Sequence, residues 1–183
     1  MDVRTLCLGL LTRSEASGYE IKKAFQSGLS HFYDASFGSI YPALSRLTEE
    51  GLVTCKEEPQ DKRPDKKVYR ITPAGRLAFI DALGRPPGHD RIRSDFLATI
   101  LFADLLSPRQ IAGLIDGRLA ETRSLLAELR AQAKEEARAA GDRFVIAYGI
   151  AVLEAEVNFL EERRHVIEGA ALLGRAPGSA AAD

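Results

Sequence analysis

Hydroxyl and guanidinium side chains gather in one segment, residues 36–51, which has the sequence SFGSIYPALSRLTEEG. Ser39 and Tyr41 can hydrogen-bond phosphate oxygens or base edges, and the planar fork of Arg46 suits O6 and N7 of guanine. Small and hydroxyl residues, Ser36 among them, open the segment, where the first backbone N–H groups of a helix have no partner. These residue types favour contact with a phosphate or a base edge.

The spacing of apolar residues predicts that this segment is a helix with one buried face. Ile40, Leu44 and Leu47 recur at i, i+4 and i+7, so they form a single apolar stripe. The residues that face away from the stripe are Tyr41, Ser45, Arg46 and Glu49. The side chains able to contact a ligand therefore lie on the exposed face.

Two residues bear on where this helix begins and ends. Gly51 occupies a position where a left-handed residue commonly ends a helix. Pro42 cannot donate a hydrogen bond to the carbonyl four residues back. Either the regular helix begins close to Ser39, or its first turn is distorted and the Gly38 carbonyl is left for water or a ligand. Both alternatives expose polar groups at the N-terminal end of the helix.

Two further helices are predicted before this one. Residues 2–12 carry apolar residues at helical spacing, and residues 19–28 follow a capping box formed by Ser17 and Glu20. Strands over residues 52–57 and 67–71 come next, and Thr72 and Pro73 begin another helix that ends near Gly84. This order predicts a mostly α-helical chain whose residues 1–84 form a winged helix-turn-helix domain of three helices and a two-stranded wing. In that geometry the third helix enters the major groove of DNA.

The hairpin between the two predicted strands has a charged tip with the sequence EPQDKRPDK. Such a tip can reach the neighbouring phosphate backbone or minor groove. Asp61 and Asp65 partly offset its positive charge. The basic residues at or next to the tip are Lys62, Arg63, Lys66 and Lys67.

The C-terminal half is predicted to be a helical dimerisation domain. Residues 85–91 have the composition of a linker, residues 92–174 are helical, and residues 175–183 form a disordered tail. One helix covers residues 92–106, a long second helix begins at Ser107 and Pro108, and Gly141 and Asp142 separate it from a third.

The last of these helices is apolar on more than one face, which predicts a second packing partner. A homodimer supplies that partner, whereas the alternative is a monomeric three-helix bundle. The residues expected at the dimer interface are Phe96, Ile100, Leu101, Phe144, Tyr148, Val152 and Phe159.

Composition and motifs exclude several functional classes. The 183-residue chain has a net charge of −1, so it is not a uniformly basic nucleic-acid binder. Its two cysteines and three histidines lack metal-ligand spacing, and there is no phosphate-binding glycine loop and no nucleophile elbow, so we expect no enzyme, metal or cofactor. No segment is long and apolar enough for a membrane span, which predicts a cytoplasmic protein. A winged helix that binds protein instead of DNA is the alternative function.

Three motifs give the chain a resemblance to the PadR family of transcriptional regulators. They are GYEIKKAF at 18–25, FGSIYPALSRLTEEGLV at 37–53 and KVYRITPAG at 67–75. The resemblance implies a homodimeric repressor that binds double-stranded DNA at a palindromic operator, and it leaves room for a small-molecule effector of unknown identity. Family members with a flat drug-binding cavity at the dimer interface often use a tryptophan there, and this chain has none. The DNA contacts that the resemblance implies are Tyr19, Ser39, Tyr41, Pro42 and Arg46, together with Lys62, Arg63 and Lys66 in the wing.

Overall fold

The computed structural model of the chain describes residues 1–25, 37–59, 66–90, 92–135 and 139–173. It divides into two compact units, Met1–Asp90 and Arg91–Asp183. Each unit has a hydrophobic core of its own, so each is described by itself.

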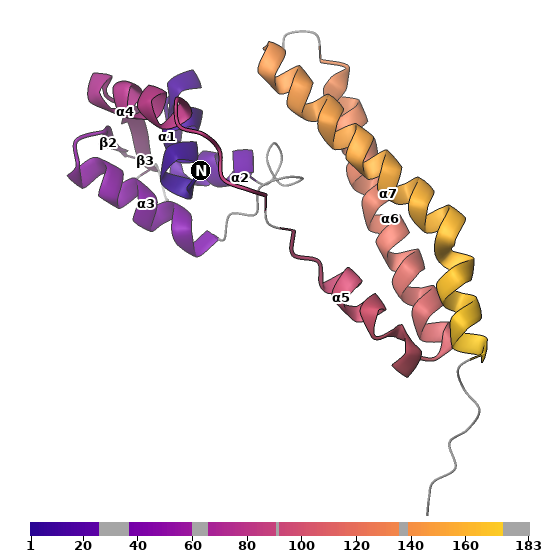
Figure 1. The fold of residues 1–183 in the computed structure, drawn as a ribbon. Helices are drawn as coiled ribbons and strands as arrows, with labels where there is room; N and C mark the ends of the chain where they lie inside the picture. Colours follow the sequence, from indigo (N-terminus) through magenta and orange to yellow (C-terminus); the bar gives the residue numbers. More distant parts are fainter. Residues whose placement is uncertain (26–36, 60–65, 91, 136–138, 174–183) are drawn as a thin grey trace, which may run out of the picture. The chain divides into compact units, whose positions relative to one another are not determined.

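The first unit is a winged helix-turn-helix, as the order of predicted elements indicated (Figure 1). Its helices and strands are α1 (Val3–Arg13), β1 (Ala16–Ser17), α2 (Gly18–Ala24), α3 (Phe37–Glu49), β2 (Val53–Glu58), β3 (Lys66–Ile71) and α4 (Pro73–Leu83).

The sheet of this unit has three strands in the order β1-β3-β2, one more than the predicted two-stranded wing. The long hairpin pairs β2 with β3 antiparallel, so that Cys55 lies opposite Tyr69. The added strand β1 pairs antiparallel with the other edge of β3, and Ser17 lies opposite Val68. A strand of two residues is too short to show the alternation by which a strand is recognised in a sequence.

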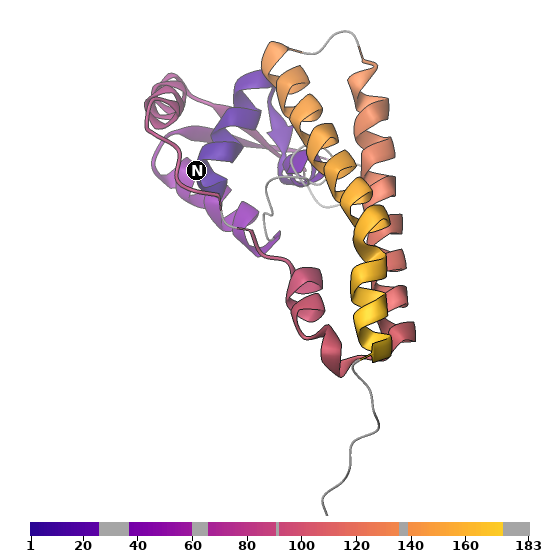
Figure 2. The ribbon, with the colours of Figure 1, turned by 45° about the vertical axis from the view of Figure 1, so that its right-hand side comes forward.

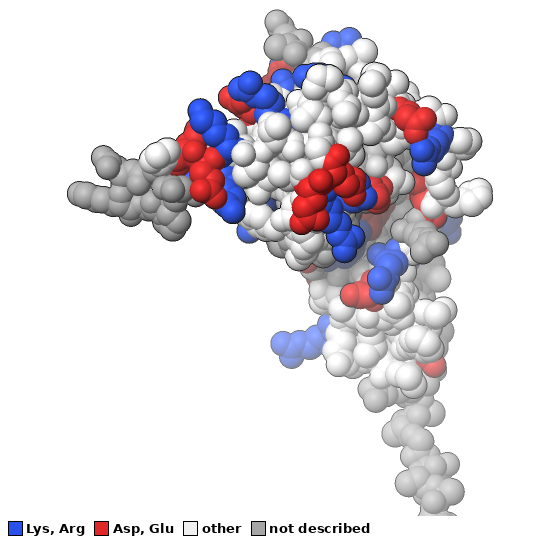
Figure 3. Space-filling model, turned by 90° about the vertical axis from the view of Figure 1, so that its left-hand side faces the viewer, with Lys and Arg blue, Asp and Glu red and all other residues white. Residues whose placement is uncertain are grey.

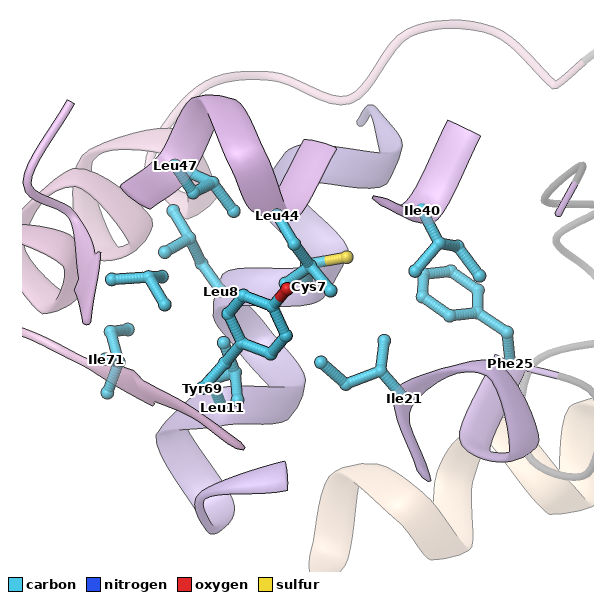
Figure 4. Close-up of a cluster of buried hydrophobic side chains, with 11 residues drawn as sticks. Cys7, Leu8, Leu11, Ile21, Phe25, Ile40, Leu44, Leu47, Tyr69 and Ile71 are labelled. Atoms are coloured by element: carbon cyan, nitrogen blue, oxygen red, sulfur yellow. The ribbon is translucent and has the colours of Figure 1, made fainter. Parts of the chain in front are cut away.

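The core of this unit joins all three N-terminal helices to the sheet. Figure 4 shows Tyr69 of β3 among side chains from α1, α2 and α3. Ile40, Leu44 and Leu47 of α3 are each no more than 1% exposed, as their spacing predicted. Cys7, which is fully buried in α1, belongs to the same cluster.

Local capping signals in the sequence gave the correct ends of several elements. Ser17 and Glu20 form the predicted capping box at the start of α2, and Thr72 caps α4 with Pro73 in its first turn. Gly51 adopts a φ of 69°, the left-handed conformation expected after α3. The hydroxyl of Thr72 also donates to the Gly51 carbonyl at 2.9 Å, which joins the start of α4 to the end of this turn.

Pro42 lies inside α3, which is helical from Phe37. The helix therefore begins before Ser39. This differs from the first of the two predicted alternatives, in which the regular helix begins close to Ser39. Because proline has no N–H, the Gly38 carbonyl cannot accept the usual bond from residue 42.

The second unit contains α5 (Asp95–Leu101), the 3₁₀ helix η2 (Ala103–Leu105), α6 (Pro108–Ala133) and α7 (Ala140–Leu173). The predicted helix over residues 92–106 was wrong in its extent. Ser94 caps the start of α5, and the helix breaks at Phe102, where φ is −109° and ψ is 28°. The predicted stop at Gly141 was also misplaced, because α6 ends at Ala133 and Gly141 lies within α7.

Helices α6 and α7 lie side by side along their length, as both ribbon views show (Figures 1 and 2). Leu126 and Leu129 of α6 pack on Leu153 of α7 in one of the apolar clusters between them. Salt bridges cross the helix pair; they include Arg118 with Glu156 at 2.7 Å, Arg123 with Glu161, Arg130 with Glu154 at 2.7 Å and Arg164 with Asp116 at 3.0 Å. Among the helices in the described ranges, none is long and apolar enough to cross a membrane.

Replacing Leu44 should destabilise the first unit because its side chain is completely buried. We expect Leu44→Ala to lower the free energy of unfolding by about 2–5 kcal/mol, through lost apolar burial and the cavity left behind. Urea unfolding followed by circular dichroism measures this change. Leu77→Ala on α4 is the matched control, since Leu77 is 70% exposed, and it should change the value by less than about 0.5 kcal/mol. Equal effects of the two variants would contradict the observed packing.

Candidate nucleic-acid interface

The outward face of α3 carries the polar residues that the sequence analysis singled out. Tyr41, Pro42 and Arg46 are exposed there, and Ser39 is half-buried. Arg46 makes no salt bridge with any residue that the structure describes, so its guanidinium is available for an external partner. A helix with this buried stripe and this outward face can place hydrogen-bonding groups in a DNA groove.

Helix α2 adds a second aromatic residue close to this face. Tyr19 is 67% exposed and directly follows Gly18, against which the ring of Tyr41 packs. The capping box holds the start of α2, because the Ser17 backbone N–H and hydroxyl both donate to Glu20 Oε2 at 2.7 Å. The two tyrosines therefore belong to neighbouring, well-fixed helix positions.

Of the four basic residues predicted in the wing, the structure describes two, Lys66 and Lys67. Lys62 and Arg63, like Ser36 before α3, lie outside the described residues. Lys66 Nζ donates to Glu20 Oε1 at 3.2 Å, and Lys67 forms a salt bridge with Glu57 at 3.4 Å. Both described lysines thus have acidic partners within the protein, and Lys66 in particular joins the base of the wing to α2.

The contact between Glu20 and Lys66 was not predicted from the sequence. The capping box signalled one role of Glu20, but its second partner is 46 residues away and no local pattern connects them. Hydrogen bonds from Ser17 and Lys66 lower the pKa of Glu20 from 4.5 to about 2, so this carboxylate is charged at neutral pH.

Charge over the surface is mixed. On the face drawn in Figure 3, acidic and basic side chains lie next to each other, and the described residues there form no continuous basic surface. This agrees with the net charge of −1. Binding to an anionic polymer would therefore depend on a few placed cations instead of the overall charge.

The two cysteines differ in burial. Burial raises the pKa of the Cys7 thiol to about 12, so it stays protonated and packs as a small apolar side chain. Cys55 is exposed on β2 and, like Cys7, is a free cysteine. No cluster of three metal-ligating side chains occurs within the part of the chain that the structure covers.

The residues predicted for dimerisation all lie in the second unit, and some are half-buried while others are exposed to solvent. Phe96 and Ile100 of α5 are half-buried, whereas Leu101 next to them is 76% exposed. On α7 an apolar stripe, named here the α7 stripe, runs along the exposed face and comprises Phe144, Tyr148, Val152, Phe159 and Val166. Contiguous exposed apolar surface of this kind is typical of interaction sites.

Comparison with known proteins covers both units. Residues 7–80 match the transcriptional regulator PadR-like family, and residues 92–168 match a family described as virulence activator alpha C-term. The negative transcriptional regulator PadR of Bacillus subtilis is 32% identical over 124 residues, which span 67% of this chain and 68% of that protein.

Solved structures of similar fold also span both units. The PadR-like regulator BC1756 of Bacillus cereus has a TM-score of 0.79 at 32% identity, covering 92% of this chain and 99% of that one. Bacillus subtilis PadR in complex with operator DNA has a TM-score of 0.74 at 27% identity, covering 90% and 98%. The same protein in complex with p-coumaric acid has a TM-score of 0.65 at 26% identity, covering 91% and 95%.

The contact between Glu20 and its partners predicts a pH dependence of stability. Because the folded pKa of Glu20 lies below its unfolded value, its contribution is complete above about pH 4.5 and is lost as the pH falls toward about 2. Since the carboxylate is largely exposed, we expect it to contribute less than about 1 kcal/mol to the free energy of unfolding. Urea unfolding of wild type and Glu20→Gln, at a series of pH values from about 2 to about 7, measures the difference in their free energies of unfolding.

The gap in unfolding free energy between wild type and Glu20→Gln should close as the pH falls. Glu58→Gln on β2 is the control, because Glu58 is exposed and forms no side-chain hydrogen bond or salt bridge with a residue in the described ranges. A gap for Glu20→Gln that stays constant with pH would rule out the charge of Glu20 as its cause.

Proposed function

The chain belongs to the PadR-like family and is a DNA-binding transcriptional regulator, and we propose that it acts as a homodimeric repressor of a palindromic operator. The observation that carries this proposal is the outward face of α3, where Tyr41 and Arg46 are exposed while the opposite face is buried. Repression is proposed from the relative named a negative regulator. The operator is proposed from the relative solved with operator DNA.

The proposed DNA contacts divide into two groups by chemistry. Arg46 and Tyr41 would read base edges in the major groove, since a guanidinium can pair with guanine and a phenol can donate or accept. Tyr19, Ser36, Ser39 and Pro42 would contact the backbone around that groove, where such contacts fix register without reading sequence. The proposed wing contacts to phosphates are Lys62, Arg63, Lys66 and Lys67. Lys66 would have to share its ammonium group between Glu20 and the phosphate.

A dimer is proposed for a geometric and an energetic reason. Two recognition helices must lie about 34 Å apart to read half-sites one helical turn apart, and a twofold axis supplies that spacing. The α7 stripe supplies the apolar surface for such an axis, because Phe144 and Phe159 are 74% and 61% exposed in the single chain. Burying these rings against a second copy would remove them from water.

A small-molecule effector is proposed from a groove in the second unit. The groove measures about 620 Å³, and its walls are mainly apolar side chains of α5 and α7, including Phe96, Leu97 and Phe159. Arg163 contributes a cation that has no salt-bridge partner among the described residues. We therefore propose an effector with an apolar body and an acidic group, a class to which the p-coumaric acid bound by the Bacillus subtilis relative belongs.

The other interpretations of the sequence have less support. The comparisons favour a DNA-binding regulator over a winged helix that binds only protein. The relatives are regulators, and we propose that this chain has no enzymatic activity. We also propose a cytoplasmic location, because that is where a bacterial-type regulator meets chromosomal DNA.

Substituting Arg46 or Tyr41 should weaken sequence-specific binding. The first step is to select duplexes from a randomised library with wild-type protein. Fluorescence anisotropy then measures the affinity of each variant at two salt concentrations. We expect Arg46→Ala and Tyr41→Ala each to cost about 1–3 kcal/mol on the selected duplex and less on an unrelated duplex.

Arg76→Ala on α4 is the charge-matched control, since Arg76 is exposed in the same unit but lies outside the proposed contacts. Equal losses for Arg46→Ala and Arg76→Ala would show that only net charge matters. Failure of wild type to enrich any duplex would overturn the operator proposal. Adding p-coumaric acid to the same assay tests whether an acid with an apolar body releases the DNA.

A charge in the middle of the α7 stripe should dissociate the dimer. We expect wild type to have twice the 20.0 kDa chain mass by light scattering, and Val152→Glu to shift toward the single mass, because a buried unpaired carboxylate is costly. Ala147→Glu is the control, since Ala147 is also exposed on α7 but lies outside the stripe. A wild-type mass of one chain would contradict the proposal.

A further inference from the structure

Ser17 at the end of β1 and the first turn of α2 form a segment, residues 17–20, named here the 17–20 turn, which contacts both parts of the proposed DNA-binding surface. On one side it meets Tyr41 of α3, and on the other it meets Lys66 of β3. Ser17 also pairs with Val68 in the sheet, so the turn is fixed to the wing strand by backbone as well as side-chain contacts.

Gly18 leaves the space that the ring of Tyr41 occupies. A Cβ added to Gly18 would lie 2.6 Å from Cε1 of Tyr41 and 3.3 Å from its Cδ1 and Cζ. The first of these distances is shorter than real Cβ contacts, so the ring would have to move. The backbone of Gly18 is helical and not left-handed, so conformation alone does not require glycine here.

The contact bears on the proposed DNA surface because Tyr41 is only partly covered. Tyr41 is 52% exposed, and the Cε1 edge of its ring lies against Gly18. A ring held in this way loses less conformational freedom when its hydroxyl group meets DNA. The position of the hydroxyl is then set by α2 as well as by α3.

Glu20 fixes the other end of the same turn. Its Oε2 accepts from the backbone N–H and the hydroxyl of Ser17, and its Oε1 accepts from Lys66 Nζ. The turn that carries Gly18 is thereby tied to the base of the wing. Displacing Tyr41 from Gly18 would change the position of the α3 contact relative to that of the wing.

We propose that Gly18 is a positioning residue for DNA recognition, which seats the Tyr41 ring against the turn that also holds the wing through Glu20. This inference rests on the proposed role of Tyr41 as a DNA contact. Gly18 itself is buried and touches no DNA in this proposal. Its contribution is to the orientation of Tyr41.

Gly18→Ala is the direct test, because it adds only the methyl group that the ring excludes. On a duplex selected from a randomised library by wild-type protein, we expect about 5- to 30-fold weaker binding, bounded by the loss in Tyr41→Ala. Affinity for an unrelated duplex and the slope of affinity against salt should stay unchanged, since no phosphate contact is lost. The melting temperature of Gly18→Ala should not fall in proportion to its loss of DNA affinity, because alanine is a better helix former than glycine. Gly117→Ala on α6 is the matched control, since a Cβ there meets nothing within 4 Å.

A double-mutant cycle isolates the contact between the methyl group and the ring. In the Tyr41→Ala background, Gly18→Ala should weaken binding no further, because the ring that it displaces is absent. Replacing the tyrosines with 3-fluorotyrosine adds a structural measurement, in which the ¹⁹F resonance of Tyr41, assigned with Tyr41→Phe, should shift in Gly18→Ala and not in Gly117→Ala.

The outcomes separate this inference from the proposed function. Unchanged binding in Tyr41→Ala would remove the DNA contact on which the inference rests. Weaker binding in Tyr41→Ala together with full binding in Gly18→Ala would overturn the role of Gly18 alone. If Gly18→Ala does not fold, recovery of folding in the Tyr41→Ala background supports the ring contact, and failure to recover contradicts it.

Discussion

Burial of one stripe of α3 is the constraint on which the DNA-binding surface depends. Ile40, Leu44 and Leu47 are almost inaccessible to solvent and pack with residues of α1, α2 and β3. In a helix, fixing three side chains at this spacing also fixes the direction of every other residue. Tyr41 and Arg46 therefore face outward as a consequence of core packing, and no separate interaction is needed to expose them.

The parts of the fold that could be predicted are those set by local chemistry. Capping at Ser17 and Thr72 and the left-handed Gly51 depend on residues within one turn, so the sequence displayed them directly. Strand β1 was missed because its two residues are defined by pairing with β3, far along the chain. The break at Phe102 was missed for a related reason, since residues 92–106 keep an apolar pattern across it.

The same distinction holds for the candidate site. The polar face of α3 followed from periodicity, and so did the exposed stripe on α7, whose residues the sequence had marked as apolar on a second face. The partner of Lys66 and the contact of Gly18 with Tyr41 did not, because each joins residues from different elements. A cluster of lysines in the sequence gives no sign of which ones already have an acidic partner in the folded chain. Here Lys66 and Lys67 both do.

The two contacts of the 17–20 turn differ in physical character, and that difference divides their roles. The close approach of Gly18 and Tyr41 depends on steric exclusion over a few tenths of an ångström, so a Cβ at position 18 would displace the ring. The salt bridge from Glu20 to Lys66 is solvent-exposed, and such a bridge is weak and easily rearranged. A phosphate could therefore compete for the Lys66 ammonium while Tyr41 keeps its place. In the proposed complex, exchange of the Lys66 partner would leave the backbone pairing of Ser17 with Val68 in place, so residues 17–20 would still join the wing strand to the Tyr41 contact.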